Sequence, residues 1–164
     1  MIKLLILTNT VIASTPMNFQ EYSGHDNFWE SKPQIVICKS QTIFTKEDVE
    51  KAISAWNESY HSIVYKEKCT YTEESGKIKI IDGKNLNYDQ WGYTSYIYND
   101  VKLGKKQVKK FKSALVQINK NINNIDILIH EIGHAFGYSH YDGTYDIMNS
   151  YADYSSNYTY NFPF

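Results

Sequence analysis

The chain has 164 residues, of which 42% are hydrophobic and 21% charged, a composition that fits one globular domain and excludes an intrinsically disordered chain. Its 17 basic residues are all lysine and stand against 18 acidic residues, which leaves a formal net charge of -1. A near-neutral chain without arginine lacks the usual means of binding nucleic acid, so we expect no nucleic-acid partner.

The first 15 residues resemble a secretory signal peptide, because Lys3 precedes the apolar run of residues 4–7 and small residues gather near Ala13. Polar residues 8–10 interrupt this run, and a first strand or a short apolar arm is the alternative. The signal predicts a secreted or otherwise extracytoplasmic protein. No stretch approaches the roughly 18 apolar residues of a membrane helix, so we expect no membrane partner.

The first predicted elements are a strand and a helix. Residues 34–38 form a short β-branched run that predicts a buried strand. The helix should begin after Thr45, which can cap it together with Asp48, and run to about Glu58. Its apolar side chains fall on one face and should pack against a sheet, namely Val49, Ala52, Ile53 and Trp56.

Four further strands follow in the predicted order, at residues 61–65, 77–81, 93–98 and 113–118. A turn is predicted at residues 73–76 and a loop at residues 82–92. Between the last two strands lies a lysine-rich segment, which we interpret as a solvated loop or hairpin tip. A docking patch for an acidic partner is the alternative.

The second helix is predicted over residues 124–136, with Asn123 or Asn124 as its cap. Its apolar stripe consists of Ile125, Leu128, Ile129 and Ile132. Gly137 should end the helix in the left-handed conformation that glycine favours at this position.

The two cysteines, Cys38 and Cys69, have no spacing typical of a metal site. Export would allow them to form one disulfide. Two free buried thiols are the alternative.

Three of the five histidines lie in the segment HEIGHAFGYSH, residues 130–140. His130 and His134 are four residues apart on the predicted helix, so they project from one face and can bind one ion. Gly137 lets the chain turn and bring His140 back as a third ligand. Three protein ligands and one open position are typical of a catalytic zinc site. Glu131 points elsewhere and can act as a general base.

A single histidine on a helix is usually structural or exposed, and HExxH alone is short enough to arise by chance. The longer pattern fixes five positions, on an amphipathic helix that ends at a glycine. This context favours a metal site with one catalytic Zn2+.

The segment resembles the zinc signature of the metzincin clan of metallopeptidases, HExxHxxGxxH. Met148, eight residues after His140, is similar in place to the methionine turn beneath the metal, with the spacing of the matrixins. Tyr141 departs from the serine that matrixins commonly carry there. Ser150 stands where astacins and serralysins place a metal-reaching tyrosine.

The resemblance implies an α+β, metzincin-like (zincin) single domain over residues 20–164, with a twisted mixed sheet, a backing helix and an active-site helix. It implies a monomeric zinc metalloendopeptidase that acts on a protein or peptide substrate. Met148 would support the site by packing. An extended substrate would pair with an edge strand that contains Thr94, Tyr96 and Tyr98.

Two other functions fit a zinc site. A catalytically inactive zinc-binding structural or binding protein is the first, but a structural ion needs no base such as Glu131. A zinc hydrolase of cell-wall amide bonds is the second, but the sequence has no recognisable wall-binding repeat.

Overall fold

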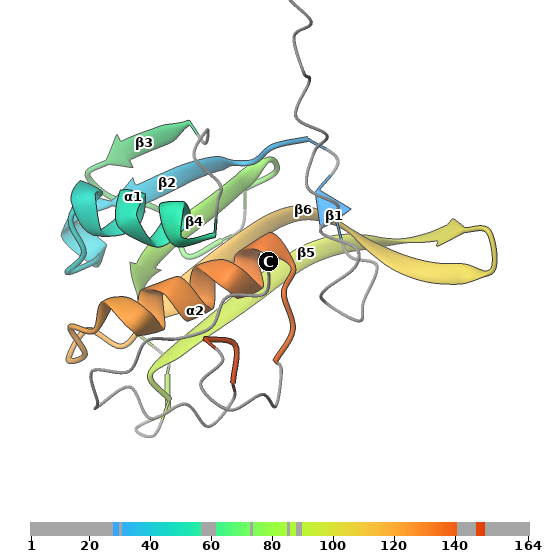
Figure 1. The fold of residues 1–164 in the computed structure, drawn as a ribbon. Helices are drawn as coiled ribbons and strands as arrows, with labels where there is room; N and C mark the ends of the chain where they lie inside the picture. The colour runs from blue at the N-terminus through green and yellow to red at the C-terminus, as the bar shows by residue number, and fades with distance from the viewer. Residues whose placement is uncertain are drawn as a thin grey trace, which may run out of the picture.

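The computed structural model describes residues 28–29, 31–56, 62–72, 74–84, 86–87, 90–140 and 147–149. The possible signal peptide, residues 1–15, lies outside this part of the chain. The described residues form an α+β fold with a mixed sheet and two α-helices (Figure 1). The elements are β1 (Phe28–Trp29), β2 (Gln34–Cys38), the 3-10 helix η1 (Lys39–Gln41), α1 (Lys46–Ala55), β3 (Ile63–Lys66), β4 (Lys77–Asp82), β5 (Gly92–Leu103), β6 (Lys106–Ile118) and α2 (Ile125–Phe136).

The sheet has six strands in the order β1-β6-β4-β2-β3, with β5 on the other edge of β6. Strands β2, β3, β4 and β6 pair in parallel, whereas β5 pairs with β6 in the antiparallel sense. No other described strand pairs with β5, so β5 is an edge strand. The expectation of a mixed sheet is confirmed.

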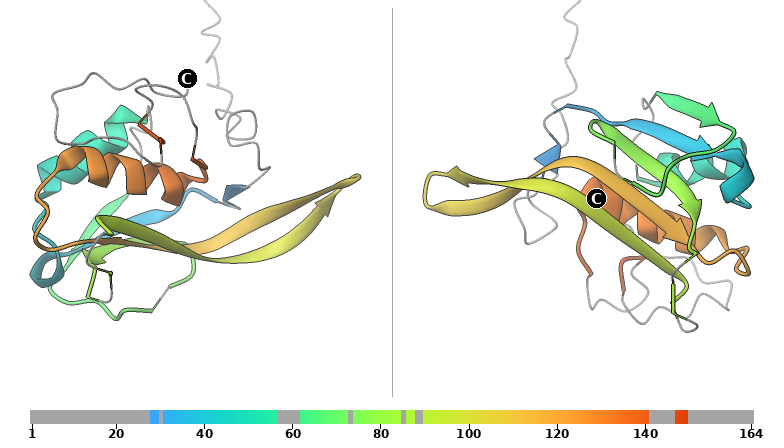
Figure 2. Two further views of the ribbon diagram at one scale, coloured as in Figure 1. Left: turned by 90° about the horizontal axis from the view of Figure 1, so that it is seen from below. Right: turned by 180° about the vertical axis from the view of Figure 1, so that it is seen from behind.

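Both helices cover one face of the sheet, as the two views in Figure 2 show. The strands alternate with a period of two, so Ile35 and Ile37 of β2 and Ile78 and Ile80 of β4 enter the core on this face. Helix α2 packs against β5, β6 and α1. This packing fixes the position of the helix that carries the histidines.

The predicted caps of the first helix are present. The Thr45 hydroxyl accepts a hydrogen bond from the Asp48 backbone at 3.2 Å, and the Asp48 carboxylate accepts one from the Thr45 backbone at 2.8 Å. This reciprocal arrangement is a capping box. The helix ends at Ala55, short of the predicted Glu58, which lies outside the described residues.

The opposite face of the sheet carries a smaller apolar cluster under the chain that precedes β4. Cys38 and Cys69 form a disulfide there, so of the two alternatives the disulfide is the one observed. Lys79 lies between Ile78 and Ile80 on β4, yet its side chain is completely buried. Its ammonium group is paired with Glu74 at 2.6 Å and donates hydrogen bonds to Thr70 and Thr72. These partners satisfy a charge that burial alone would make costly.

The lysine-rich segment is mostly strand, which corrects the prediction that β-structure begins again only at residue 113. Strands β5 and β6 pair continuously to Leu103 and Lys106, so only Gly104 and Lys105 form the turn of the hairpin. Gly104 adopts φ +63, a conformation that glycine tolerates and other residues rarely do. The outer part of this hairpin, residues 98–112, extends past the end of β4, and β1 pairs only with its base at Lys110 and Phe111 (Figure 1); we call it the arm.

Among the described residues, no helix combines the length and apolar character that a bilayer crossing requires.

Candidate metal centre

Helix α2 is fixed at both ends. Asn124 caps its start by accepting a hydrogen bond from the Asp126 backbone at 2.8 Å, which decides between the two predicted caps. Gly137 follows its end in the left-handed conformation, with φ +110. The Gly137 and Tyr138 amides donate to carbonyls of the last helical turn at 2.8 and 3.1 Å. The predicted helix and its glycine terminator are confirmed.

Two tryptophans that lie outside helix α2 donate hydrogen bonds to carbonyl groups of its backbone. The Trp56 indole donates a hydrogen bond to the Ile129 carbonyl, and the Trp29 indole donates to the Ala135 carbonyl, each at 2.9 Å. Trp56 also stacks on Tyr138 with ring centroids 4.5 Å apart. These contacts tie the histidine helix to α1 and to β1.

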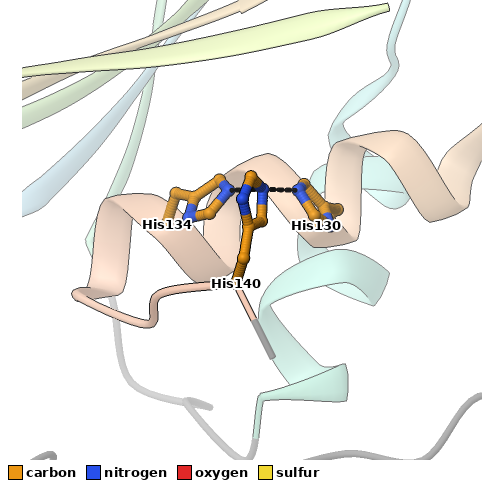
Figure 3. A group of neighbouring side chains, drawn as sticks. All are labelled: His130, His134 and His140. Carbon is orange, nitrogen blue, oxygen red and sulfur yellow. Dashed lines mark hydrogen bonds between the residues drawn. The ribbon is translucent and has the colours of Figure 1, made fainter. Parts of the chain in front are cut away.

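The three predicted ligands converge on one point. The Nε2 atom of His140 lies 3.0 Å from that of His134 and 3.3 Å from that of His130 (Figure 3). Nitrogen ligands at zinc–nitrogen distances of about 2.0–2.1 Å in a tetrahedron are separated by about 3.3–3.4 Å. The two separations made by His140 are close to this value, and all three ligand atoms lie within 4.8 Å of one another, so these three histidines could hold a metal ion.

Backbone carbonyls fix the orientation of two of these rings. Nδ1 of His130 donates to the Ile147 carbonyl at 2.7 Å, and Nδ1 of His134 donates to the Tyr138 carbonyl at 2.8 Å. A carbonyl oxygen only accepts hydrogen bonds, so each Nδ1 carries the proton of the neutral imidazole. The Nε2 lone pairs of both rings consequently point toward the shared centre, as a metal ion requires.

Burial keeps these two rings neutral. It lowers the pKa of His130 to about 4, although the hydrogen bond to Ile147 opposes this shift. It lowers the pKa of His134 to about 3, and the neighbouring His130 adds to the effect. His130 is buried, His134 is half-buried and His140 is exposed, so the cluster reaches the surface on the side of His140.

Glu131 is held against strand β5. Its carboxylate accepts a hydrogen bond from the Thr94 hydroxyl at 2.6 Å, and only 6% of the residue is exposed. Burial raises the pKa of Glu131 to about 7, an effect that the Thr94 hydrogen bond partly opposes. A Cβ atom on Gly92 would lie 2.5 Å from Oε1 of Glu131, so a side chain at position 92 would displace the carboxylate.

The predicted substrate strand does lie at the sheet edge, but its three named residues differ in their surroundings. Thr94 is buried against Glu131. Tyr96 stacks on Phe111 at 4.8 Å, and burial raises its pKa, with the Glu131 charge as the second cause. Tyr98 is 40% exposed, and the Lys109 ammonium lies 4.3 Å from its ring centre.

Met148 lies beside the histidine helix and is completely buried. A Cβ on Gly133 would be 2.7 Å from the Met148 sulfur and would collide with the Trp56 ring. Glycine inside this helix therefore allows two large side chains to approach closely. Met148 packs in the core beside this helix, its support of a metal site stays a prediction, and its neighbour Ile147 supplies the carbonyl that orients His130.

Several contributors to the site carry no signal in the sequence. The carbonyls of Ile147 and Tyr138 are backbone groups and could be assigned only from the fold. The contact of Thr94 with Glu131 joins residues 37 positions apart. Gly92 and Gly133 stand out only once the atoms near each glycine are known.

Comparison with known proteins does not place the chain in a family: no protein-family model matches the sequence, and no curated protein matches it. The chemistry of the site is therefore inferred from its own residues.

Proposed function

We propose that this chain is a zinc-dependent metalloendopeptidase of the matrixin type within the metzincin clan. The observation that carries the proposal is the convergence of three Nε2 atoms, two of them with tautomers fixed by backbone carbonyls. Three imidazoles with one open position are the ligand set of catalytic rather than structural zinc. A buried carboxylate directly after the first ligand supports a hydrolytic role.

Each residue has a defined part in the proposed reaction. Zinc bound by His130, His134 and His140 would polarise a water and the scissile carbonyl. Glu131 takes a proton from the attacking water and then delivers it to the leaving amine. Thr94 keeps the Glu131 carboxylate in one orientation. The outer edge of β5 binds an extended substrate through main-chain hydrogen bonds, which tolerate many sequences.

Digestion of a peptide library, with and without a chelator, tests this function. We expect cleavage that the chelator abolishes and that added zinc restores. Glu131→Gln should retain zinc and lower turnover by about 10²–10⁴-fold, the usual contribution of a general acid–base residue. His134→Ala should lose zinc, because two imidazoles remain.

Two results would contradict the proposal. Normal cleavage by Glu131→Gln would remove the assigned base. Stoichiometric zinc without cleavage of any peptide would favour a catalytically inactive zinc-binding protein.

An extracytoplasmic location also remains a prediction. The Cys38–Cys69 disulfide supports it, because disulfides persist mainly in oxidising compartments. Thiol labelling of the protein from its native source tests it, and two reactive thiols would argue for a reducing compartment.

A further inference from the structure

Positive charge is concentrated in one projecting element of the molecule. The arm, residues 98–112, contains six lysines and one aspartate and so has a formal charge of +5. Since the whole chain has a formal charge of -1, the rest of the chain carries -6. The six lysines are Lys102, Lys105, Lys106, Lys109, Lys110 and Lys112.

The arm is an ordered ribbon and not a loose loop. Its strands pair in register to the turn, and Val101 lies opposite Val108, which is 2% exposed. Among the described residues, strand pairing in the arm is between β5 and β6, apart from the pairs that β6 makes with β1 at its base (Figure 2). An isolated two-stranded ribbon is marginal in water, so the valine pair and the glycine turn contribute to its order.

The lysines do not form one flat basic face. Lys102 lies opposite Gln107, and the next pair along the ladder, Leu103 and Lys106, points to the other side of the ribbon. Large apolar side chains are exposed among them, with Tyr98 at 40% and Leu103 at 46%. A planar anionic membrane would meet only some of these charges. Binding of nucleic acid would normally use arginine, which the chain lacks.

We propose that the arm is a docking site for an acidic segment of the polypeptide substrate. The inference rests on the proposed peptidase function, because the same strand β5 carries Thr94, which contacts Glu131, and continues past a register shift at Ile97 and Tyr98 into the arm. A chain extended along the free edge of β5 would therefore pass from the cleavage site to Lys102 on β5 and Lys105 in the turn, whereas the other four lysines lie on the adjacent strand β6. Lysine ammonium groups would attract its carboxylates, and the exposed apolar side chains would contact its other residues.

The length of the strand sets where the acidic residues should lie. Thr94 and Leu103 are nine positions apart along β5, which corresponds to about 30 Å of extended chain. Acidic residues about six to ten positions from the cleaved bond would reach the arm, whereas residues within about three positions would not.

Peptide kinetics test this arrangement. Each peptide has one cleavable bond and a block of four glutamates. The block lies either next to that bond or eight positions away, on its N-terminal or its C-terminal side. Peptides with glutamine in place of glutamate are the controls. We expect the distant glutamate block on one side to raise kcat/KM about tenfold, mainly through KM, and 0.5 M salt to cancel the gain. An equal gain from glutamine would overturn the proposal.

Paired variants assign the effect to the arm. Lys102→Gln/Lys105→Gln should remove most of the gain, whereas the control Lys68→Gln/Lys120→Gln, which removes the same charge from two exposed positions elsewhere, should retain it. If both double variants lost the gain in kcat/KM equally, the net charge of the protein would explain the gain, and the arm would not be a specific docking site.

A binding experiment separates this proposal from the peptidase function. Poly-glutamate should bind the Glu131→Gln protein in a salt-sensitive manner, and the arm variant should bind it about tenfold more weakly. This result would support the arm even if no peptide were cleaved. Tighter binding to duplex DNA or to vesicles of anionic phospholipid than to poly-glutamate would overturn the choice of partner.

Discussion

The Thr94 hydroxyl donates its hydrogen bond to the carboxylate proposed as the general base. This contact favours the ionised carboxylate and opposes the upward pKa shift that burial causes. In Thr94→Val the hydroxyl is lost at nearly constant volume, so the pKa of Glu131 should rise. We expect the acid limb of the kcat/KM profile to move to higher pH, with zinc content unchanged. Thr94→Ser should restore the original profile; a profile unmoved in Thr94→Val would remove this role from Thr94.

The order of events in acid follows from the same residues. Burial raises the pKa of Glu131 from 4.5 to about 7, and a bound cation would draw it back toward the ordinary value. The pKa values of His130 and His134 are instead lowered, to about 4 and about 3, so these rings resist protonation. As the pH falls, activity should therefore disappear between about 7 and 4.5, before zinc is released. Parallel assays of turnover and bound zinc check this order, and zinc release at the higher pH would contradict it.

At the scale of elements, the junction after α2 connects helix termination to metal binding. Gly137 holds φ +110, and the residue after it supplies the carbonyl that orients His134. Gly137→Ala should lower the free energy of unfolding by about 1–2 kcal/mol and also weaken zinc binding. Gly76→Ala, at φ +71 in a turn remote from the histidines, is the matched control for backbone strain. Thermal unfolding and zinc titration of both variants should show lost stability in each but weaker zinc binding only in Gly137→Ala.

The sequence predicted the helices better than the arm. The cap at Thr45, the apolar stripe of α2 and the stop at Gly137 are local signals, and all three are present. The continuation of β5 and β6 through the lysines was missed, because charged residues resemble a loop when no pairing partner is known. The burial of Lys79 was not predictable either, since its partners in residues 70–74 come together only in the folded chain.

At the scale of the whole molecule, the disulfide anchors the chain that covers the outer face of the sheet. It joins residues 31 positions apart. Closing a loop of this length in the unfolded chain is expected to raise the free energy of unfolding by about 4 kcal/mol. Cys38→Ser/Cys69→Ser should therefore unfold at lower denaturant concentration. Zinc affinity of the folded variant should be unchanged, because the disulfide lies across the sheet from α2. Combined denaturation and zinc titration checks both points, and weaker zinc binding would show coupling between the two faces.

The metal centre itself was largely predictable, because its three ligands and its base lie within 11 consecutive residues on one helix and the turn after it. The parts that orient these residues come from elsewhere in the chain. Thr94 reaches the base from β5, and the Ile147 carbonyl reaches the first ligand from beyond the third. Such long-range contacts depend on the packing of α2 against the sheet, which local spacing does not encode.

The central claim is that three imidazoles share one zinc ion and leave one position open. Zinc K-edge X-ray absorption, measured on the protein loaded with one equivalent of zinc, tests it most directly. The expected spectrum has three imidazole nitrogens at about 2.0–2.1 Å and one further light-atom ligand. His140→Ala should remove one imidazole. A sulfur shell, a shell of six oxygens or fewer than three imidazoles in the unmodified protein would contradict the account.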